Sequence, residues 1–99
     1  MTSSAVNNLS RLGITLPDAP APAANYVPYV IAGNMVFVSG QLPLVEGKLS
    51  VTGHVGKDVT TEQAAEQARQ CAINLLAQLN SACGGDLGRV KQVVKLGGF

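Results

Sequence analysis

The segment from Thr60 to Cys83 carries the longest helical pattern in this sequence, and it restricts the fold more than any other feature. Thr60 and Gln63 have the spacing of a capping box, and Gly84-Gly85 follows the segment as a helix stop. Apolar residues recur at spacings of three and four, which gives the helix one apolar face: Ala64, Ala68, Ala72, Leu75, Leu76, Leu79 and Cys83. A helix of this kind has to pack against another layer, and we expect that layer to be a sheet.

Two apolar segments before the helix predict a β-hairpin. Residues 26–32 and 35–39 flank Gly33-Asn34, a two-residue turn signal. In the second segment three apolar residues follow one another without alternation, which predicts a strand covered on both faces. Residues 49–55 predict a weaker third strand and residues 90–96 a fourth. The order strand-strand-strand-helix-strand predicts an α+β fold with the helix on one face of the sheet.

The first 25 residues differ from the rest in composition. Residues 3–12 predict a short helix with Val6, Leu9 and Leu12 in one stripe, closed by Gly13. The tract 16–24 contains three prolines and predicts an extended surface linker. We therefore expect an appendage over 1–25 and a domain over 26–99. Since about 70 residues make a marginal core, we expect either a partner chain or further sequence to complete the sheet.

Composition argues against several classes of protein. The 99-residue chain has a net charge of +1 and seven scattered Lys and Arg residues, which does not predict a nucleic-acid partner. No apolar stretch approaches the roughly 18 residues of a membrane span, and the polar first twelve residues lack a signal-peptide core. Cys71 and Cys83 would lie about 18 Å apart along one helix, too far for a disulfide. We expect a cytoplasmic protein with free thiols.

Few residues suggest chemistry, and none forms a metal or cofactor motif. His54 is the single histidine, so we expect it to be incidental. The strand exit Ser39-Gly40-Gln41 offers a hydroxyl and an open backbone that could bind a polar ligand; the alternative is a plain strand-to-turn exit. Asn74 is a polar residue within the helix, and it is either a surface asparagine or one that bonds to a neighbouring loop.

Several of these segments, taken together, resemble the RidA/YjgF family, whose older names are endoribonuclease L-PSP and translation initiation inhibitor. The resemblance runs from Tyr26 to Phe99, and the N-terminal residues are similar to a branch of the family with longer chains. The matching segments are Tyr26, Gly33-Asn34-Met35, Ser39-Gly40-Gln41-Leu42-Pro43, Gln67-Ala68-Arg69-Gln70, Asn74-Leu75 and Val90–Leu96.

The resemblance implies a chorismate-mutase-like α+β fold that assembles as a homotrimeric barrel, with small-molecule sites between subunits and no cofactor. It implies hydrolysis of reactive enamines and imines, such as 2-aminoacrylate, to 2-oxo acids and ammonia. By position, Tyr26, Ser39, Gly40 and Asn74 match substrate-binding residues. The family's catalytic arginine and glutamate lie in its second half, so the resemblance assigns no catalytic residue here, and we expect the sequence to lack the C-terminal part of the fold.

Two further functions remain open at this stage. The same trimer can instead bind a small carboxylate, such as a 2-oxo acid, without turning it over. An endoribonuclease activity has also been ascribed to the family, but the scattered charge of this sequence argues against it.

Overall fold

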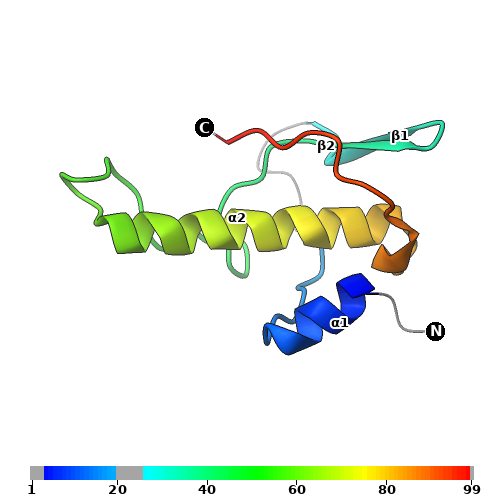
Figure 1. Ribbon diagram of the computed structural model, residues 1–99. Coiled ribbons are helices and arrows are strands. Elements are labelled where there is room, and N and C mark those ends of the chain that lie inside the picture. Colours follow the sequence, from blue (N-terminus) through cyan, green and yellow to red (C-terminus); the bar gives the residue numbers. More distant parts are fainter. Residues whose placement is uncertain (1–3, 20–25, 99) are drawn as a thin grey trace.

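The computed structural model describes residues 4–19 and 26–98 and has one long helix at its centre (Figure 1). Helix α2 (Thr61–Ala82) is contacted by the two-stranded sheet of β1 (Tyr29–Ala32) and β2 (Met35–Val38). Helix α1 (Ser4–Arg11) lies on the other side of α2 and contacts the short 3-10 helix η1 (Leu87–Arg89). The predicted α+β class is confirmed.

Both ends of α2 follow the sequence signals. The Thr60 hydroxyl accepts a hydrogen bond from the Gln63 N–H (3.1 Å), and the Gln63 side-chain oxygen accepts one from the Thr60 N–H (2.8 Å). This reciprocal pair satisfies two N–H groups that the first helical turn leaves without partners. At the other end, Gly84 and Gly85 have positive φ angles of 68° and 90°. The predicted capping box and helix stop are confirmed.

The hairpin forms at the predicted turn, but only one of its faces is covered. Gly33 has φ 61°, as the first central residue of a II′ turn requires, and Ala32 pairs with Met35. Val36 and Val38 are half-buried towards α2, and the Tyr29 and Ser81 hydroxyls lie 3.3 Å apart across the same interface. On the other face Phe37 is 58% exposed. The expectation of a strand covered on both faces is therefore wrong for the described residues. Helix α2 covers one face of the hairpin, and no described element covers the other.

The third and fourth strands that the sequence predicts are not formed. Residues 49–54 have no regular structure, and Val55 instead bridges to Val59 in a tight loop, with Gly53 at φ 132° and Gly56 at φ 90°. Residues 90–98 run past α2 without joining the sheet. Both predictions rested on apolar composition, whereas a strand also needs the backbone groups of a neighbour to pair with.

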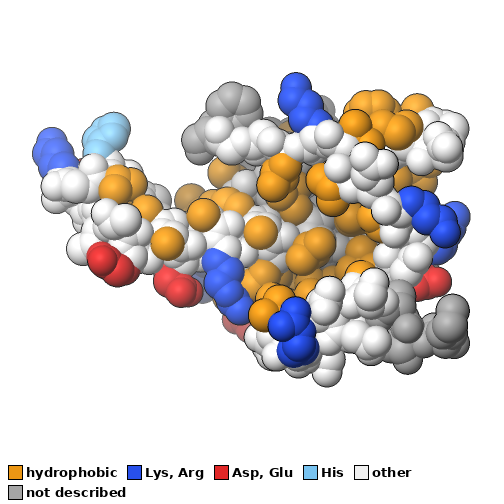
Figure 2. All heavy atoms as spheres, viewed as in Figure 1, with side chains coloured by type: hydrophobic (Ala, Val, Ile, Leu, Met, Phe, Trp, Pro, Cys, Tyr) orange, Lys and Arg blue, Asp and Glu red, His pale blue; other side chains and the backbone are white. Residues whose placement is uncertain are grey.

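Helix α2 buries a different strip from the predicted apolar face. Its buried residues are Ile73, Asn74, Ala77 and Gln78. On the predicted face Ala68 and Ala72 are exposed, and the leucines at 75, 76 and 79 are only half-buried. Figure 2 shows hydrophobic side chains gathered in a hollow over this part of the molecule. The predicted face therefore exists as a surface, but the described chain leaves much of it open.

The N-terminal helix is confirmed over Ser4–Arg11, and Gly13 closes it with φ 70°. Val6 and Leu12 of the predicted stripe are exposed, so this stripe is only partly buried. Ser3, the first residue of the predicted helix, and residues 20–24 of the Pro/Ala tract lie outside the described residues. The division into 1–25 and 26–99 remains a prediction.

Both cysteines are free thiols, as expected, and Cys71 is half-buried on α2. Burial raises the pKa of the Cys71 thiol, and a backbone hydrogen bond partly offsets this shift. In the described part of the chain, no helix is long and apolar enough to cross a membrane.

The turn at Glu46-Gly47 yields a stability prediction. It joins Val45 to Lys48, and Glu46 takes φ 51°, a left-handed conformation that asparagine adopts more readily. Glu46→Asn should raise the free energy of unfolding by roughly 0.5–1 kcal/mol, measured by urea denaturation. The control is Lys57→Asn, at an exposed residue outside the left-handed region. Equal effects of the two changes would contradict this account of the turn.

The raised pKa of Cys71 yields a reactivity prediction. Since the thiolate is the nucleophile, iodoacetamide at pH 8 should alkylate Cys71 more slowly in the folded protein than in urea. The folded thiol should reach full reactivity only at a higher pH than the unfolded one. Because the folded state disfavours the thiolate, the free energy of unfolding should fall as pH rises above the ordinary thiol pKa. Equal alkylation rates in both states would contradict the shift.

Candidate functional site

The end of strand β2 is held in place by Ser39. Its N–H donates to the Pro28 carbonyl (2.9 Å), which extends the hairpin ladder one pair beyond β2. Its hydroxyl donates to the Val27 carbonyl (2.7 Å). The hydroxyl proton of Ser39 is thus engaged within the protein, whereas the hydroxyl oxygen can still accept a hydrogen bond from a ligand.

Gly40 and Tyr26 meet directly beside Ser39. The Tyr26 hydroxyl donates to the Gly40 carbonyl (3.3 Å), which brings together three of the four residues predicted to bind substrate. The Gly40 N–H has no acceptor among the described residues, and a side chain built on Gly40 would meet nothing within 4 Å. This N–H is therefore an available donor at an open point of the surface.

Gln41 occupies carbonyl groups at the same strand end. Its side-chain amide turns back and donates to the carbonyls of Ser39 (3.1 Å) and Gly40 (3.3 Å). Two carbonyl groups are occupied in this way while the Gly40 N–H stays open. Such an arrangement suits a ligand that brings acceptor oxygens, a carboxylate above all.

The fourth predicted site residue, Asn74, lies apart from this group. It is 1% exposed, and its amide nitrogen donates to the carbonyls of Leu42 (2.9 Å) and Leu44 (3.0 Å). Of the two interpretations of Asn74, the bond to a neighbouring loop is confirmed and the surface asparagine is wrong. In this structure its role is to hold the loop that follows Gly40 onto α2.

Gln70 assists Asn74, and sequence reasoning did not single it out. Its amide nitrogen lies 3.2 Å from the Asn74 side-chain oxygen and 3.3 Å from the Leu44 carbonyl. Gln70 and Asn74 are four residues apart, which is the spacing of neighbours on one helix face. In the sequence, the pair of amide side chains at this spacing was the one sign that Gln70 and Asn74 act together.

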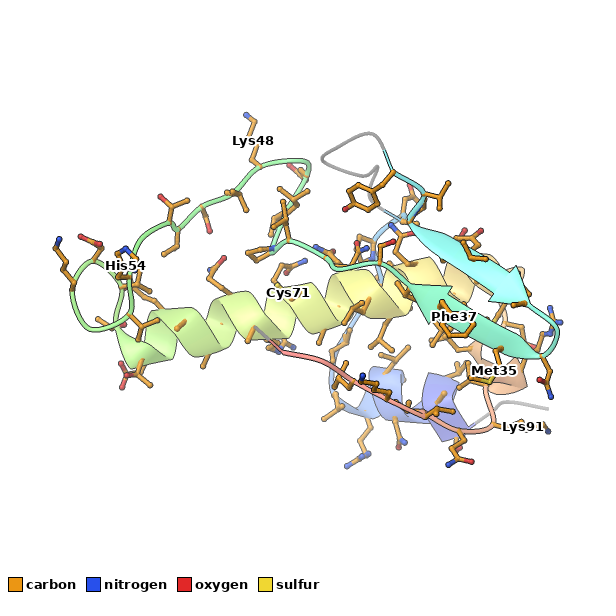
Figure 3. All side chains as sticks on the ribbon, turned by 90° about the horizontal axis from the view of Figure 1, so that it is seen from above. Met35, Phe37, Lys48, His54, Cys71 and Lys91 are labelled. Carbon is orange, nitrogen blue, oxygen red and sulfur yellow. The ribbon has the colours of Figure 1, made fainter. Side chains whose placement is uncertain are left out.

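His54 has no part in this group. Figure 3 shows it in the loop that precedes α2, where its side chain is exposed. Among residues 4–19 and 26–98, no three His, Cys, Asp or Glu side chains lie close enough to hold a metal ion.

The buried amide leads to a direct prediction. Asn74→Ala should lower the free energy of unfolding by about 2–3 kcal/mol, because it removes the amide that donates to the loop carbonyls of Leu42 and Leu44 and holds the loop on α2. Urea denaturation measures the change. Asn80→Ala is the control, since the half-buried Asn80 amide makes no hydrogen bond to the described residues. A cost at Asn74 no larger than at Asn80 would show that the amide does not hold the loop.

Comparisons with curated proteins give two clear relatives. Protein TCP17 of Trypanosoma cruzi is 49% identical over 92 residues, which cover 93% of this chain and 57% of the relative. The RutC family protein y4sK of Sinorhizobium fredii is 38% identical over 84 residues, covering 84% of this chain and 60% of the relative. The chain thus spans less than two thirds of the length of these relatives.

Solved structures agree with the sequence relatives. Protein Atu1372 of Agrobacterium tumefaciens, whose function is described as unknown, superposes with a TM-score of 0.77 at 49% identity, covering 89% of this chain and 53% of that one. A "putative endoribonuclease" from Shewanella oneidensis gives a TM-score of 0.79 at 39% identity, covering 88% and 57%. The model of the family described as "YjgF/chorismate_mutase-like, putative endoribonuclease" matches residues 6–99. The chain belongs to the YjgF/chorismate mutase-like family.

Proposed function

We propose that the protein hydrolyses reactive enamines and imines, such as 2-aminoacrylate, to 2-oxo acids and ammonia. The observation that carries this proposal is the open Gly40 N–H, placed beside the Tyr26 hydroxyl at a strand end whose carbonyls are already occupied. These substrates all carry a carboxylate, which takes up such donors. Membership of the YjgF family supports the same class of substrate.

In the proposed reaction, an enamine such as 2-aminoacrylate first becomes the imine, as its CH2 carbon takes up a proton and its nitrogen gives one up. Water then adds to the carbon of the C=N bond. The electron pair of that bond moves to nitrogen, which takes up a proton, and the resulting tetrahedral carbon expels ammonia to leave the 2-oxo acid. In this scheme Gly40 holds the carboxylate, and the fixed Ser39 hydroxyl keeps the Gly40 backbone in place. The groups that bind and deprotonate the water are not assigned within these 99 residues.

We further propose that the active form is a homotrimer. The face of the hairpin opposite α2 carries the exposed side chains of Val30, Met35 and Phe37. Figure 3 shows Met35 and Phe37 on the hairpin. An exposed apolar sheet face of this kind is suited to contact with other subunits.

Two other activities compete with this proposal. The same strand end can bind a 2-oxo acid without chemistry, since the described residues supply binding groups and no assigned base. Endoribonuclease appears in the printed names of the family and of the Shewanella structure. Assays of ammonia release, 2-oxobutyrate binding and RNA cleavage on one preparation separate the three.

A matched pair of glycines tests the role of Gly40. Gly40 and Gly98 both lie outside the left-handed region, and both have open space where a Cβ would be. Gly40→Val should fold normally, since a Cβ at this position meets nothing within 4 Å. It should raise KM for 2-aminoacrylate, generated in situ by a dehydratase, by about tenfold or more. A tenfold change is equivalent to about 1.4 kcal/mol of lost binding. Gly98→Val should leave KM unchanged.

The three assays, together with the two glycine variants, can refute the proposed function. Ammonia release no faster than in buffer, from a trimer that includes the full length of the fold, would exclude the deaminase. Binding of 2-oxobutyrate without turnover would favour the binding protein, and cleavage of RNA would favour the nuclease. Equal effects of the two glycine changes on KM would show that Gly40 does not hold the substrate.

A further inference from the structure

A cavity lies where the loop after Gly40 and the N-terminal segment both approach α2. Its volume is ≈ 470 Å³, which is within the roughly 300–1,000 Å³ of typical small-molecule sites. Residues 17–18, residues 44–47 and the α2 amides Gln70 and Asn74 line it. Tyr26, Ser39 and Gly40 are not part of this lining, so the cavity is separate from the strand end described above.

The wall formed by residues 44–47 is fixed by hydrogen bonds. The Leu44 carbonyl accepts from the side-chain amides of Asn74 (3.0 Å) and Gln70 (3.3 Å). Val45 and Lys48 exchange two backbone hydrogen bonds of 3.0 Å each across the turn. A ligand that enters the cavity therefore meets a wall that is already ordered, which lowers the entropic cost of binding.

A second wall comes from the N-terminal segment. The Ile14 N–H donates to the Leu9 carbonyl (2.9 Å), which ties the segment to the end of α1, and α1 in turn contacts η1. Pro17 then restricts the backbone directly before Asp18. The tract that the sequence predicts as a surface linker thus supplies two of its residues to a cavity wall.

The lining of the cavity offers unpaired acceptors and negative charge. Its charged residues are Asp18 and Glu46, and neither carboxylate makes a hydrogen bond or ion pair with another described residue. The Gln70 side-chain oxygen also has no donor among the described residues. Figure 3 shows that the Lys48 side chain points away from α2. Acceptors from three segments suit a ligand that brings donors and a positive charge.

A metal ion fits this lining poorly. Calcium takes roughly six to eight oxygen ligands, whereas among residues 4–19 and 26–98 no three His, Cys, Asp or Glu side chains lie close enough to hold a metal ion. Pro17, Leu44 and Val45 make much of the remaining lining apolar. An organic cation satisfies both parts of the lining, because its charge can lie beside the carboxylates and its aliphatic chain against the apolar side chains.

We propose that this cavity is a further small-molecule site, and that it binds an aliphatic primary amine in its ammonium form. The ammonium group lies beside Asp18 and Glu46, and the chain packs against the apolar side chains. The proposal combines two separate observations, a cavity of small-molecule size and unpaired acceptors from three segments around it. It does not depend on the proposed deaminase activity.

An NMR titration of the full-length protein with n-butylammonium tests the site. The backbone amides of residues 45–47 and the side-chain amide of Gln70 should shift and saturate, while the Gly33 amide at the hairpin turn stays in place. Butyrate and 1-butanol have the same chain length with the opposite charge or none. Both should bind about tenfold or more weakly, because two exposed carboxylates each favour the cation.

Three carboxylates form a matched set of variants. Asp18, Glu46 and Glu66 are all exposed, but Glu66 does not line the cavity. Asp18→Asn and Glu46→Gln should each raise the Kd for n-butylammonium about two- to fivefold, as expected for the loss of an exposed ion pair, and the double variant should raise it about tenfold. Glu66→Gln removes the same charge and should leave the Kd unchanged.

Three outcomes would overturn the proposal. Shifts that do not saturate, or that are as large at Gly33, would mean that the amine associates without a site. Binding of 1-butanol or butyrate as tight as that of n-butylammonium would mean that the carboxylates do not select the ligand. An equal effect of Glu66→Gln would assign the binding to net charge alone. None of these readouts uses a substrate or Gly40, so failure here and failure of the deaminase are distinguishable.

Discussion

The hydrogen bonds from the Asn74 amide to the carbonyls of Leu42 and Leu44 connect the two parts of the molecule on which the proposed function depends. Asparagine is not a favoured residue within a helix, and one that is 1% exposed needs partners for its amide. The loop carbonyls provide them. In return the loop is fixed to α2 directly after Gly40, so the position of the strand end follows from the position of the helix.

The polar groups at that strand end are almost all engaged with one another. Ser39 is bonded to the 27–28 backbone, Tyr26 to the Gly40 carbonyl, and Gln41 to two carbonyls. Groups already fixed lose little freedom when a ligand binds. The Gly40 N–H remains open beside these fixed groups, so a ligand would meet a donor held in a rigid setting.

Features encoded within a few residues of sequence were predictable. The capping box of Thr60 and Gln63, the stop at Gly84-Gly85 and the Gly33 turn are all set by local backbone chemistry, and all three form as expected. The grouping of Tyr26 with Ser39 and Gly40 was expected from the family resemblance alone, and a hydrogen bond joins Tyr26 to Gly40 in the structure. Features that depend on distant partners were not predictable in this way. Residues 49–55 and 90–96 have the composition of strands, but no neighbouring strand in the described chain pairs with them.

The side of α2 that becomes buried also depends on partners distant in the sequence, so the sequence pattern did not predict it. Periodicity identifies the alanine and leucine face correctly as apolar, yet the described chain buries Asn74 and Gln78 more completely than the leucines. Polar side chains can be buried where backbone carbonyls satisfy them, and a hydrophobic pattern cannot reveal such partners. The role of Gln70 was missed for the same reason, because it depends on a loop 26 residues earlier in the chain.

The proposed function requires above all that the Gly40 N–H receives the carboxylate of a ligand. A titration of the assembled protein with 2-oxobutyrate, followed by the NMR signals of backbone amides, tests it most directly. The Gly40 amide should move downfield and saturate, as expected for a donor that gains a charged acceptor, while the Gly98 amide stays in place. A Gly40 signal that does not move at saturating ligand, or that moves no more than Gly98, would contradict the claim.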